Sequence, residues 1–400
     1  MGTPTELRLG VAGLGRAFVL MLPTLVHHPR VRLAAAADPR PEARETFERD
    51  FAGRAHETVE ALCADPAVDA VYVATPHGMH VEHVRSAAAH GKHVLVEKPM
   101  ALAVEDCLAM IEAARAAGVR LLVGHSHSFD LPYLRTRTLI ETGAFGAVRM
   151  INAFTFTDFL YRPRRPEELD TAQGGGALYN QAPHQVDVVR LLVGAPARGV
   201  RAAAGVWDPS RPTEGAYNAF LAFEGGAAAN LSYSGHGRFS TDELCGWIDE
   251  MGQPRDPGAY GEARRRLRGV RPGAEEAALK ERRAYGTGLD ASEARRASPP
   301  PAHNHFGFVL VSCERADLRP TPDGVVIYGE EERRFEALPP PAVARAEVMD
   351  ELAAAVLDGV PPLHSGEWGL ATVEVCQAIH TSAREGREVP LRHQAGAAPA

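Results

Sequence analysis

Short apolar runs alternate with helical patterns over the first 125 residues. The runs end at a glycine, a proline or a polar residue, and they are Leu7–Ala12, Val31–Ala37, Asp69–Ala74, His93–Val96 and Arg120–Val123. Stretches between them, such as Val81–His90 and Val104–Ala117, have helical spacing. This alternation predicts right-handed βαβ units in a doubly wound parallel sheet. Ligands of such sheets bind at the carboxyl ends of the strands, where the polar residues of these runs fall.

The pattern changes after about residue 127. Longer, more alternating strands are expected at Val148–Thr157, Ala216–Phe223, Ala227–Tyr233 and His305–Cys313. Strands in direct succession, with Gly225-Gly226 between two of them, favour hairpins and an antiparallel or mixed sheet. Two amphipathic helices are expected within Ala342–Glu385. We therefore expect an α/β domain over residues 1–126, an α+β domain over 127–392 and a flexible tail over 393–400.

Residues 253–300 form a distinct basic segment inside the second domain. The segment holds 11 Lys or Arg and 7 Asp or Glu, so its net charge is +4 while the rest of the chain carries −12. It is rich in alanine and ends in three prolines. A solvated helical insertion is one interpretation. The other is a flap or oligomer contact that brings basic side chains near an anionic substrate.

Composition narrows the class of protein. The chain has 400 residues, 45% of them hydrophobic, and a net charge of −8, which suits two globular domains and argues against a nucleic-acid partner. We see no apolar run of membrane-spanning length and no secretory signal. The five cysteines are dispersed without a Cys-x-x-Cys pair, so we expect reduced thiols in a cytoplasmic protein, with no zinc site and no membrane partner.

The most specific local motif lies after the first predicted strand. Gly13 permits a tight turn, Gly15 lets the backbone approach a pyrophosphate, and the following helix offers its N-terminal amides to the phosphates. Phe18 replaces the third glycine of G-x-G-x-x-G, so the helix–strand contact there must be looser or rearranged. Asp38 ends the next strand, where a carboxylate accepts hydrogen bonds from the ribose hydroxyls of NAD and repels a 2′-phosphate. Arg40 keeps NADP as the alternative.

Two further clusters suggest proton transfer. Lys98, in Glu97-Lys98-Pro99, falls at the ligand edge of the sheet, where desolvation and a cationic nicotinamide would lower the pKa of an amine. In Gly174–Asp187, Pro183 suits a helix start and places His184 and Asp187 on one helix face. A histidine oriented by a carboxylate suits a general base, although a helix cap with a structural histidine gives the same pattern. Histidines also gather at strand ends, and without ligand spacing we expect them to line a polar pocket and to bind no metal; they are His77, His80, His125 and His127.

Together these motifs resemble the Gfo/Idh/MocA oxidoreductase family. The resemblance rests on Ala12–Arg16, Ala74–Pro76, Glu97–Pro99 and Gly174–Asp187, and it extends over about residues 6 to 390. It implies an N-terminal Rossmann domain that binds NAD(P), a C-terminal domain with a large open sheet, and a homodimer or homotetramer. It also implies that Lys98 acts at the nicotinamide and that His184 contacts the reacting hydroxyl. Many members carry Asp where this chain has Asn180, which cannot take a proton, so the base must be Lys98 or His184.

From the motifs and the resemblance we expect three groups of site residues. The catalytic pair is Lys98 and His184. The substrate-binding residues are Asn180, Asp187, His125 and His127. The cofactor-binding residues are Gly13, Leu14, Gly15, Arg16, Ala17, Asp38, Thr75, Pro76, His80, Glu97 and Lys98.

Within the family, the likeness is greater to the subgroup called phthalate 4,5-cis-dihydrodiol dehydrogenases. It rests on Gly10–Pro23, Gly124–Ser128, Asn180–His184 and His305–Arg315. It implies NAD-dependent oxidation of a cyclic cis-dihydrodiol, such as 4,5-dihydro-4,5-dihydroxyphthalate, to a catechol. Arginines of the basic segment, or Arg162, Arg164 and Arg165, are candidate counter-charges for a dicarboxylate, although most suit an ordinary surface. The alternatives are a sugar or inositol dehydrogenase, an NAD-using glycosidase or lyase, and a non-catalytic NAD-binding sensor.

Overall fold

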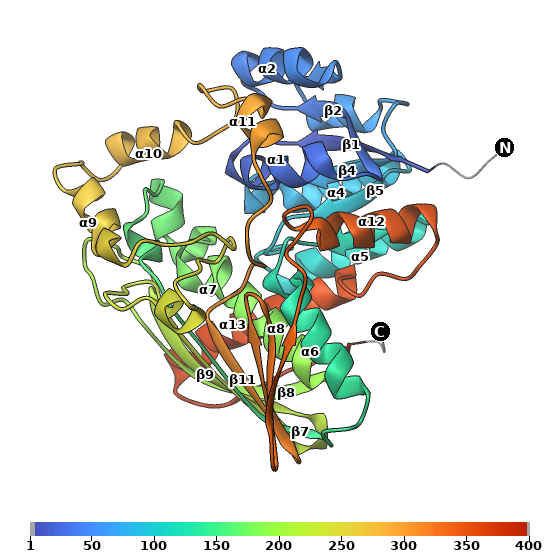
Figure 1. Ribbon diagram of the computed structural model, residues 1–400. Coiled ribbons are helices and arrows are strands. Elements are labelled where there is room, and N and C mark those ends of the chain that lie inside the picture. Colours follow the sequence, from blue (N-terminus) through green and yellow to red (C-terminus); the bar gives the residue numbers. More distant parts are fainter. Residues whose placement is uncertain (1–4, 398–400) are drawn as a thin grey trace. The chain divides into compact units, whose positions relative to one another are not determined.

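The computed structural model describes residues 5–397 as two compact units (Figure 1). The first unit contains residues 5–125 together with Ala278–Pro299 and Ala342–Leu370. The second unit contains Ser126–Ala277, Pro300–Pro341 and residues 371–397. The sequence pattern placed both added segments of the first unit in the second domain.

The first unit is built on a six-stranded parallel sheet of order β3-β2-β1-β4-β5-β6. Its strands are β1 Leu7–Ala12, β2 Val31–Ala37, β3 Arg54–His56, β4 Ala70–Val73, β5 His93–Val96 and β6 Leu121–Val123. Its helices are α1 Arg16–His27, α2 Pro41–Phe51, α3 Val59–Cys63, α4 His80–Ala89, α5 Val104–Ala117, α11 Ala291–Arg296 and α12 Ala346–Leu357. The strand order reverses direction between β1 and β4, the switch point at which open α/β sheets bind ligands. The predicted Rossmann sheet is confirmed.

The chain-distant segment Ala342–Leu370 packs on this unit. The Thr24 hydroxyl on α1 donates a hydrogen bond to the Ala344 carbonyl, and His28 Nε2 lies 3.1 Å from Asp350 on α12. The Val123 amide donates to the His364 carbonyl at 2.9 Å, which extends the β6 edge. These contacts cover the sheet with a helix from near the end of the chain.

The second unit carries a nine-stranded mixed sheet of order β14-β13-β12-β11-β7-β10-β9-β8-β15. Its strand pairs are antiparallel except β7 with β10. Its strands are β7 Val148–Phe156, β8 Ala197–Gly205, β9 Ala216–Phe223, β10 Ala228–Ser234, β11 Phe308–Cys313, β12 Ala316–Thr321, β13 Gly324–Gly329, β14 Arg333–Ala337 and β15 Val389–Pro390. The predicted antiparallel-rich sheet is confirmed.

Helices of the second half cover this sheet or form the insertion. They are α6 Leu131–Glu141, α7 Gly176–Asn180, α8 Ala182–Val193, α9 Glu262–Leu267, α10 Ala274–Glu281 and α13 Gly366–Glu385. Short 3-10 turns begin at His77, His127, Phe159, Pro166, Thr171, Glu224, Thr241 and Pro257. Part of the expected tail is held in place, because Gln394 donates to the Ala371 carbonyl at 3.0 Å; residues 398–400 lie outside the described residues. Within residues 5–397, no helix is both long and apolar enough to cross a membrane.

Candidate active site

The loop between β1 and α1 has the geometry of a phosphate cradle. Gly13 has φ +93°, and its amide donates to the Ala37 carbonyl at 2.8 Å. A Cβ at Gly13 would lie 3.0 Å from the Ala74 carbonyl oxygen. A Cβ at Gly15, the N-cap of α1, would meet nothing within 4 Å. The N-terminus of α1 therefore begins at the switch point with open space beside Gly15, and this loop fits the pyrophosphate of a dinucleotide.

Phe18, in place of the third glycine, is fully buried on α1. Its ring meets the Tyr285 ring edge-on, with centroids 5.1 Å apart and an interplanar angle of 89°. Tyr285 belongs to the basic insertion and is also fully buried. The helix–strand contact is therefore rearranged as expected, with the bulk of Phe18 packed against a residue far along the chain.

Asp38 lies at the end of β2 and is 5% exposed. Its carboxylate accepts hydrogen bonds from the Leu14 amide at 2.8 Å and from the Arg40 amide at 3.0 Å. The Arg40 guanidinium adds two more, from Nε at 2.9 Å and from Nη2 at 3.0 Å. These four bonds match the four acceptor positions of a carboxylate. Asp38, the residue predicted to bind the ribose, is thus paired with Arg40, the cation that leaves NADP as the alternative cofactor.

The loops after β4 and β5 hold the remaining predicted cofactor residues. His80 is fully buried, and its ring nitrogens lie 2.9 Å from the Thr75 carbonyl and 3.1 Å from the Met100 carbonyl. His80 therefore ties the two loops together. The Thr75 hydroxyl lies 2.9 Å from His83 Nδ1.

Glu97 precedes Lys98 at the end of β5. It accepts a hydrogen bond from the Tyr72 hydroxyl at 2.6 Å and one from the Lys98 amide at 3.2 Å. Burial raises the pKa of Glu97, and the positive charge of Lys98 opposes this shift. The pKa of His77 is lowered to about 3, mainly by burial and further by the charges of His80, Lys98 and Lys280. At the end of β5, the Glu97 carboxylate therefore holds the Lys98 backbone amide and is itself fixed by the Tyr72 hydroxyl.

The Asn180 side chain holds the glycine-rich stretch of the second unit. Gly176 has φ +77°, and a Cβ there would collide with the Thr213 hydroxyl. The Asn180 side-chain amide donates to the carbonyls of Gly174 at 3.0 Å and Gly176 at 2.9 Å. Asn180 therefore holds the loop that precedes α8.

His184 and Asp187 both lie on α8 and are nearly buried. Asp187 accepts a hydrogen bond from the Thr372 hydroxyl and lies 3.6 Å from Arg190, which is 2% exposed. Burial lowers the pKa of Arg190 to about 10. Asp187 therefore serves as a counter-charge to a buried arginine.

Two histidines of the second unit pack together. The rings of His127 and His184 meet edge-on, with centroids 4.7 Å apart, and each packs on the Phe306 ring. His127 Nδ1 lies 2.6 Å from an Asp130 carboxylate oxygen, so the carboxylate–histidine pair shown here is formed by Asp130. The His-x-x-Asp spacing of residues 127 and 130 was the signal that could have found Asp130. Phe306 lies in the His305–Arg315 stretch of the subgroup resemblance, but nothing in the sequence pointed to its contact with these histidines.

Two of the loop arginines, Arg162 and Arg164, are engaged by neighbouring side chains. Arg162 bonds to Asp158 at 3.1 Å and to Glu250 at 3.0 Å. The Arg164 guanidinium lies 3.7 Å from the Phe159 ring centre, and burial lowers its pKa to about 10. Arg164 Nε is buried with no hydrogen-bond partner among residues 5–397.

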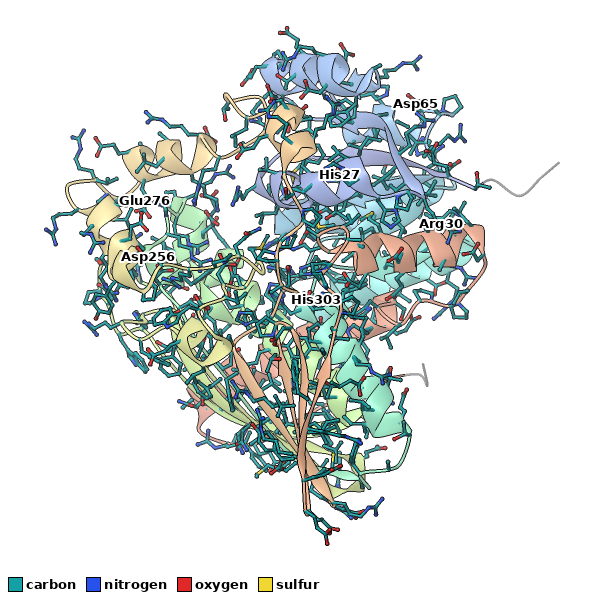
Figure 2. The ribbon with its side chains drawn as sticks, viewed as in Figure 1. His27, Arg30, Asp65, Asp256, Glu276 and His303 are labelled. Carbon is teal, nitrogen blue, oxygen red and sulfur yellow. The ribbon has the colours of Figure 1, made fainter. Side chains whose placement is uncertain are left out.

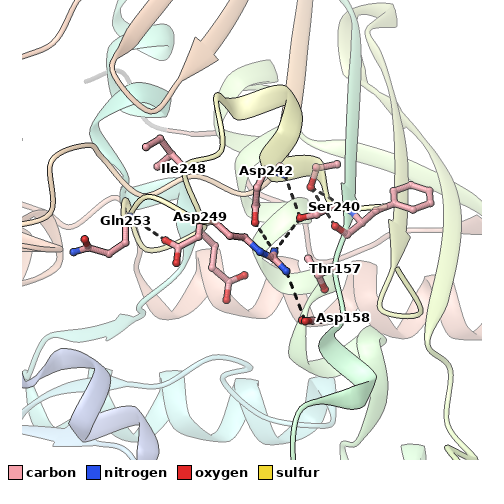
Figure 3. Close-up of polar contacts among 12 residues, drawn as sticks. Thr157, Asp158, Ser240, Asp242, Ile248, Asp249 and Gln253 are labelled. Carbon is pink, nitrogen blue, oxygen red and sulfur yellow. Dashed lines mark hydrogen bonds and ion pairs between the residues drawn. The ribbon is translucent and has the colours of Figure 1, made fainter. Parts of the chain in front are cut away.

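Arg255 of the insertion lines a pocket of about 490 Å³ in the second unit. It donates to the Ser240 hydroxyl at 3.0 Å and to Asp242 at 2.6 Å, and it lies 3.8 Å from Asp158 (Figure 3). Its charge is therefore compensated by the protein. Three aromatic rings and two more arginines also line this pocket; they are Phe239, Trp247, Tyr260, Arg238 and Arg264.

The structure thus gathers the predicted site residues in two sets. The first unit brings together Gly13, Leu14, Gly15, Arg16, Ala17, Asp38, Thr75, Pro76, His80, Glu97 and Lys98 at the carboxyl edge of its sheet and the loops that follow. The second unit brings His127 beside His184, while Asn180 and Asp187 lie before and along α8. His125 is buried at the end of the first unit.

Family models match both halves of the chain. Residues 7–125 match the oxidoreductase family with an NAD-binding Rossmann fold, and residues 133–245 match the GFO/IDH/MocA C-terminal domain. The chain belongs to the Gfo/Idh/MocA oxidoreductase family. It is an NAD(P)-dependent dehydrogenase that acts on a CH–OH donor.

Individual relatives add to this assignment. The chain is 45% identical over 374 residues to 1-carboxy-3-chloro-3,4-dihydroxycyclohexa-1,5-diene dehydrogenase of Comamonas testosteroni, covering 93% of this chain and 94% of the relative. A solved structure from Bordetella bronchiseptica RB50, described as a dehydrogenase by resemblance, matches with a TM-score of 0.89 at 42% identity, over 96% of this chain and all of that one. Aldose-aldose oxidoreductase of Caulobacter crescentus matches with a TM-score of 0.69 at 25% identity, over 96% of this chain and all of that one.

Proposed function

We propose that this protein oxidises a vicinal diol on a carboxylated cyclohexadiene ring to the corresponding catechol. The observation that carries the proposal is the near full-length match to the Comamonas testosteroni dehydrogenase, whose substrate is such a diol. That substrate has one carboxylate. The dicarboxylate 4,5-dihydro-4,5-dihydroxyphthalate is therefore the second choice among ring diols.

The oxidation of the diol to the catechol removes one hydride and, in net terms, one proton. The carbinol carbon loses its hydrogen as hydride, and its hydroxyl loses a proton, which gives a ketone. The second ring carbon then loses its proton, the ketone oxygen takes up a proton and becomes a phenol hydroxyl, and the second hydroxyl is kept. When bound, NAD supplies the hydride acceptor. Formation of the aromatic ring makes the overall oxidation favourable.

We assign the hydroxyl proton to Lys98 or His184. Glu97 holds the backbone before Lys98, and its carboxylate is oriented by Tyr72. His184 packs against His127, which Asp130 orients. Asn180, which has no acid–base function, holds the glycine-rich loop. Proton transfer of this kind contributes about 10²- to 10⁴-fold in rate.

We propose NAD as the preferred cofactor, with Asp38 at the adenosine ribose. The acidic residue at the end of β2 supports this choice, and its pairing with Arg40 supports use of NADP as well. We further propose a cytoplasmic homodimer or homotetramer. The reduced state of all five cysteines is consistent with the cytoplasm.

The deciding experiment follows reduced-nicotinamide absorbance with a panel of substrates and both cofactors. The panel holds the chlorinated and unchlorinated monocarboxylate diols, the phthalate diol, inositols and aldoses. Turnover on a monocarboxylate diol with NAD is the expected result. Turnover on polyols alone would refute it and favour a sugar dehydrogenase, the function that the aldose-aldose oxidoreductase likeness supports.

Two variants test the catalytic assignment. Lys98→Met and His184→Gln should each lower kcat, with the larger loss at the residue that takes the proton. Lys92→Met is the matched control, because Lys92 Nζ bonds to the Asp65 and Val68 carbonyls outside the site. Equal activity of all three variants would contradict both assignments.

A further inference from the structure

Residues 280–296 of the basic insertion pack on the dinucleotide-binding unit, and we call this segment the strap. The strap lies between β10 and β11 in the sequence but belongs to the first unit. Figure 1 shows its helix α11 beside α1. The sequence left open whether the insertion is a solvated helix or a flap.

Tyr285 is the centre of the docked strap. Its amide donates to the Leu14 carbonyl at 3.2 Å, and its carbonyl accepts from Arg40 Nη1 at 3.2 Å. Its hydroxyl donates to Asp50 on α2, and its ring packs on Phe18. One buried residue therefore bonds to the glycine loop, to Arg40 after β2 and to α2, and packs its ring against α1.

The rest of the strap is fixed on the same face. Asp50 also accepts a hydrogen bond from the Ala291 amide at 2.8 Å. His27, labelled in Figure 2, lies on α1 with its Nε2 3.1 Å from the Ala294 carbonyl. Gly286 approaches α2 so closely that a Cβ would lie 2.6 Å from the Ala43 Cα.

The course of the strap crosses the dinucleotide path. Tyr285 bonds to the loop after β1 and to Arg40 after β2. The strap thus crosses the carboxyl ends of β1 and β2, where a Rossmann fold holds the adenosine half of its dinucleotide.

Docking also occupies the ribose-binding carboxylate. Arg40 is held by the carbonyls of Leu14 and Tyr285 as well as by Asp38. In this arrangement the four acceptor positions of Asp38 are filled by Leu14 and Arg40. A ribose hydroxyl can bond to Asp38 only after Arg40 has moved.

We propose that the strap is part of the cofactor site and controls exchange of the dinucleotide. Entry and exit of the adenosine half require the strap to undock from Leu14 and Ala43 and Arg40 to leave Asp38. Tyr285 is a positioning residue, because it acts on the ribose site through Arg40. The inference rests on the dinucleotide site and does not depend on which diol is oxidised.

Two glycines of the strap give a matched test. Gly286 and Gly288 have φ +84° and +88°, so alanine is strained to a similar degree at both. Only Gly286→Ala adds a collision with α2, since a Cβ at Gly288 would meet nothing within 4 Å. The assay is stopped-flow fluorescence of NADH binding and release, with no substrate present.

We expect Gly286→Ala to associate with and release NADH at least about tenfold faster than Gly288→Ala, which corresponds to about 1.4 kcal/mol of lost docking. Equal rates in the two variants, or slower exchange in Gly286→Ala, would overturn the proposal. If Gly286→Ala does not fold, Tyr285→Phe decides, because it removes the bond to Asp50 and keeps the ring. Its exchange should be faster than that of Tyr260→Phe, a change at an exposed tyrosine of the same insertion, and equal rates would overturn the proposal. Because no substrate is used, a failed diol assay leaves this result unaffected.

Discussion

Shortening Phe18 should destabilise the first unit strongly, although the dinucleotide fingerprint usually has glycine at this position. Phe18 is fully buried on α1 and packs edge-on against Tyr285. In Phe18→Ala the surrounding groups belong to helices and a strap that cannot collapse fully into the space. A buried Phe→Ala change costs about 3–5 kcal/mol. The loss should be a large part of the roughly 5–15 kcal/mol that stabilises a typical domain.

The edge-on ring pair supplies an independent part of this loss. Aromatic pairs contribute about 0.5–1.5 kcal/mol beyond their buried area. A double-mutant cycle of Phe18→Ala and Tyr285→Ala should therefore show coupling of that size. Urea unfolding, followed by far-UV circular dichroism, gives the free energies, and Phe220→Ala is the control because Phe220 on β9 is 46% exposed.

Two results would refute this reasoning. A Phe18→Ala loss below about 1 kcal/mol, close to the ordinary effect of surface changes, would mean that Phe18 is not enclosed. Additivity of the two changes within about 0.3–0.5 kcal/mol would mean that Tyr285 does not pack on Phe18.

Three further predictions concern charged groups. Arg40→Gln should weaken NADPH binding at least about tenfold relative to NADH, because a charge-assisted bond contributes about 1.5–3 kcal/mol. Titration calorimetry checks it against Arg49→Gln on α2, the helix that follows Arg40, and an unchanged ratio would exclude Arg40 as a phosphate contact. The pKa of His77 is about 3 in the folded protein and about 6.5 in the unfolded chain. Because the unfolded chain takes up the proton first, the free energy of unfolding should fall by up to about 1.4 kcal/mol per pH unit as pH falls through this interval. Lys280→Met should raise that pKa in an NMR titration, and an unmoved pKa would place Lys280 away from His77. Asp187→Ala should lower stability by about 3–5 kcal/mol, since it leaves buried Arg190 without its carboxylate, whereas a role in substrate binding alone would change KM and leave the unfolding free energy intact.

The sequence predicts best what local pattern controls. Leu7–Ala12, Val31–Ala37 and His93–Val96 are strands with the expected bounds, because each is an apolar run with a clear stop. Gly13 and Gly15 take the expected places because their backbone requirements are local. The strands of Ala316–Ala337 were not predicted. Charged and polar residues interrupt the alternation of Ala316–Thr321 and Arg333–Ala337, and between them Gly324–Gly329 is a short apolar run bounded by glycines.

Contacts between distant residues were beyond reach of the sequence. Phe18 looked like a defect of the motif, and only Tyr285, 267 positions later, explains it. Arg40 was recognised as a charge near the ribose, but its bond to the Tyr285 carbonyl depends on how the strap docks. Asp187 was placed correctly on the helix with His184, while Arg190 and Thr372 take up its carboxylate through tertiary packing.

The interleaving of segments in the first unit has a consequence for how the protein is made. Its sheet is encoded by residues 5–125, but α11 is synthesised after four of the nine strands of the second unit, and α12 after eight of them. Domains generally fold in the order of their synthesis. The nascent sheet must therefore remain incomplete until about 245 further residues have been added. During this time the α1 face that later contacts Ala344 and Asp350 is exposed. A fragment cut after residue 125 would keep that face bare permanently, so the gene cannot be divided at the boundary that its strand pattern suggests.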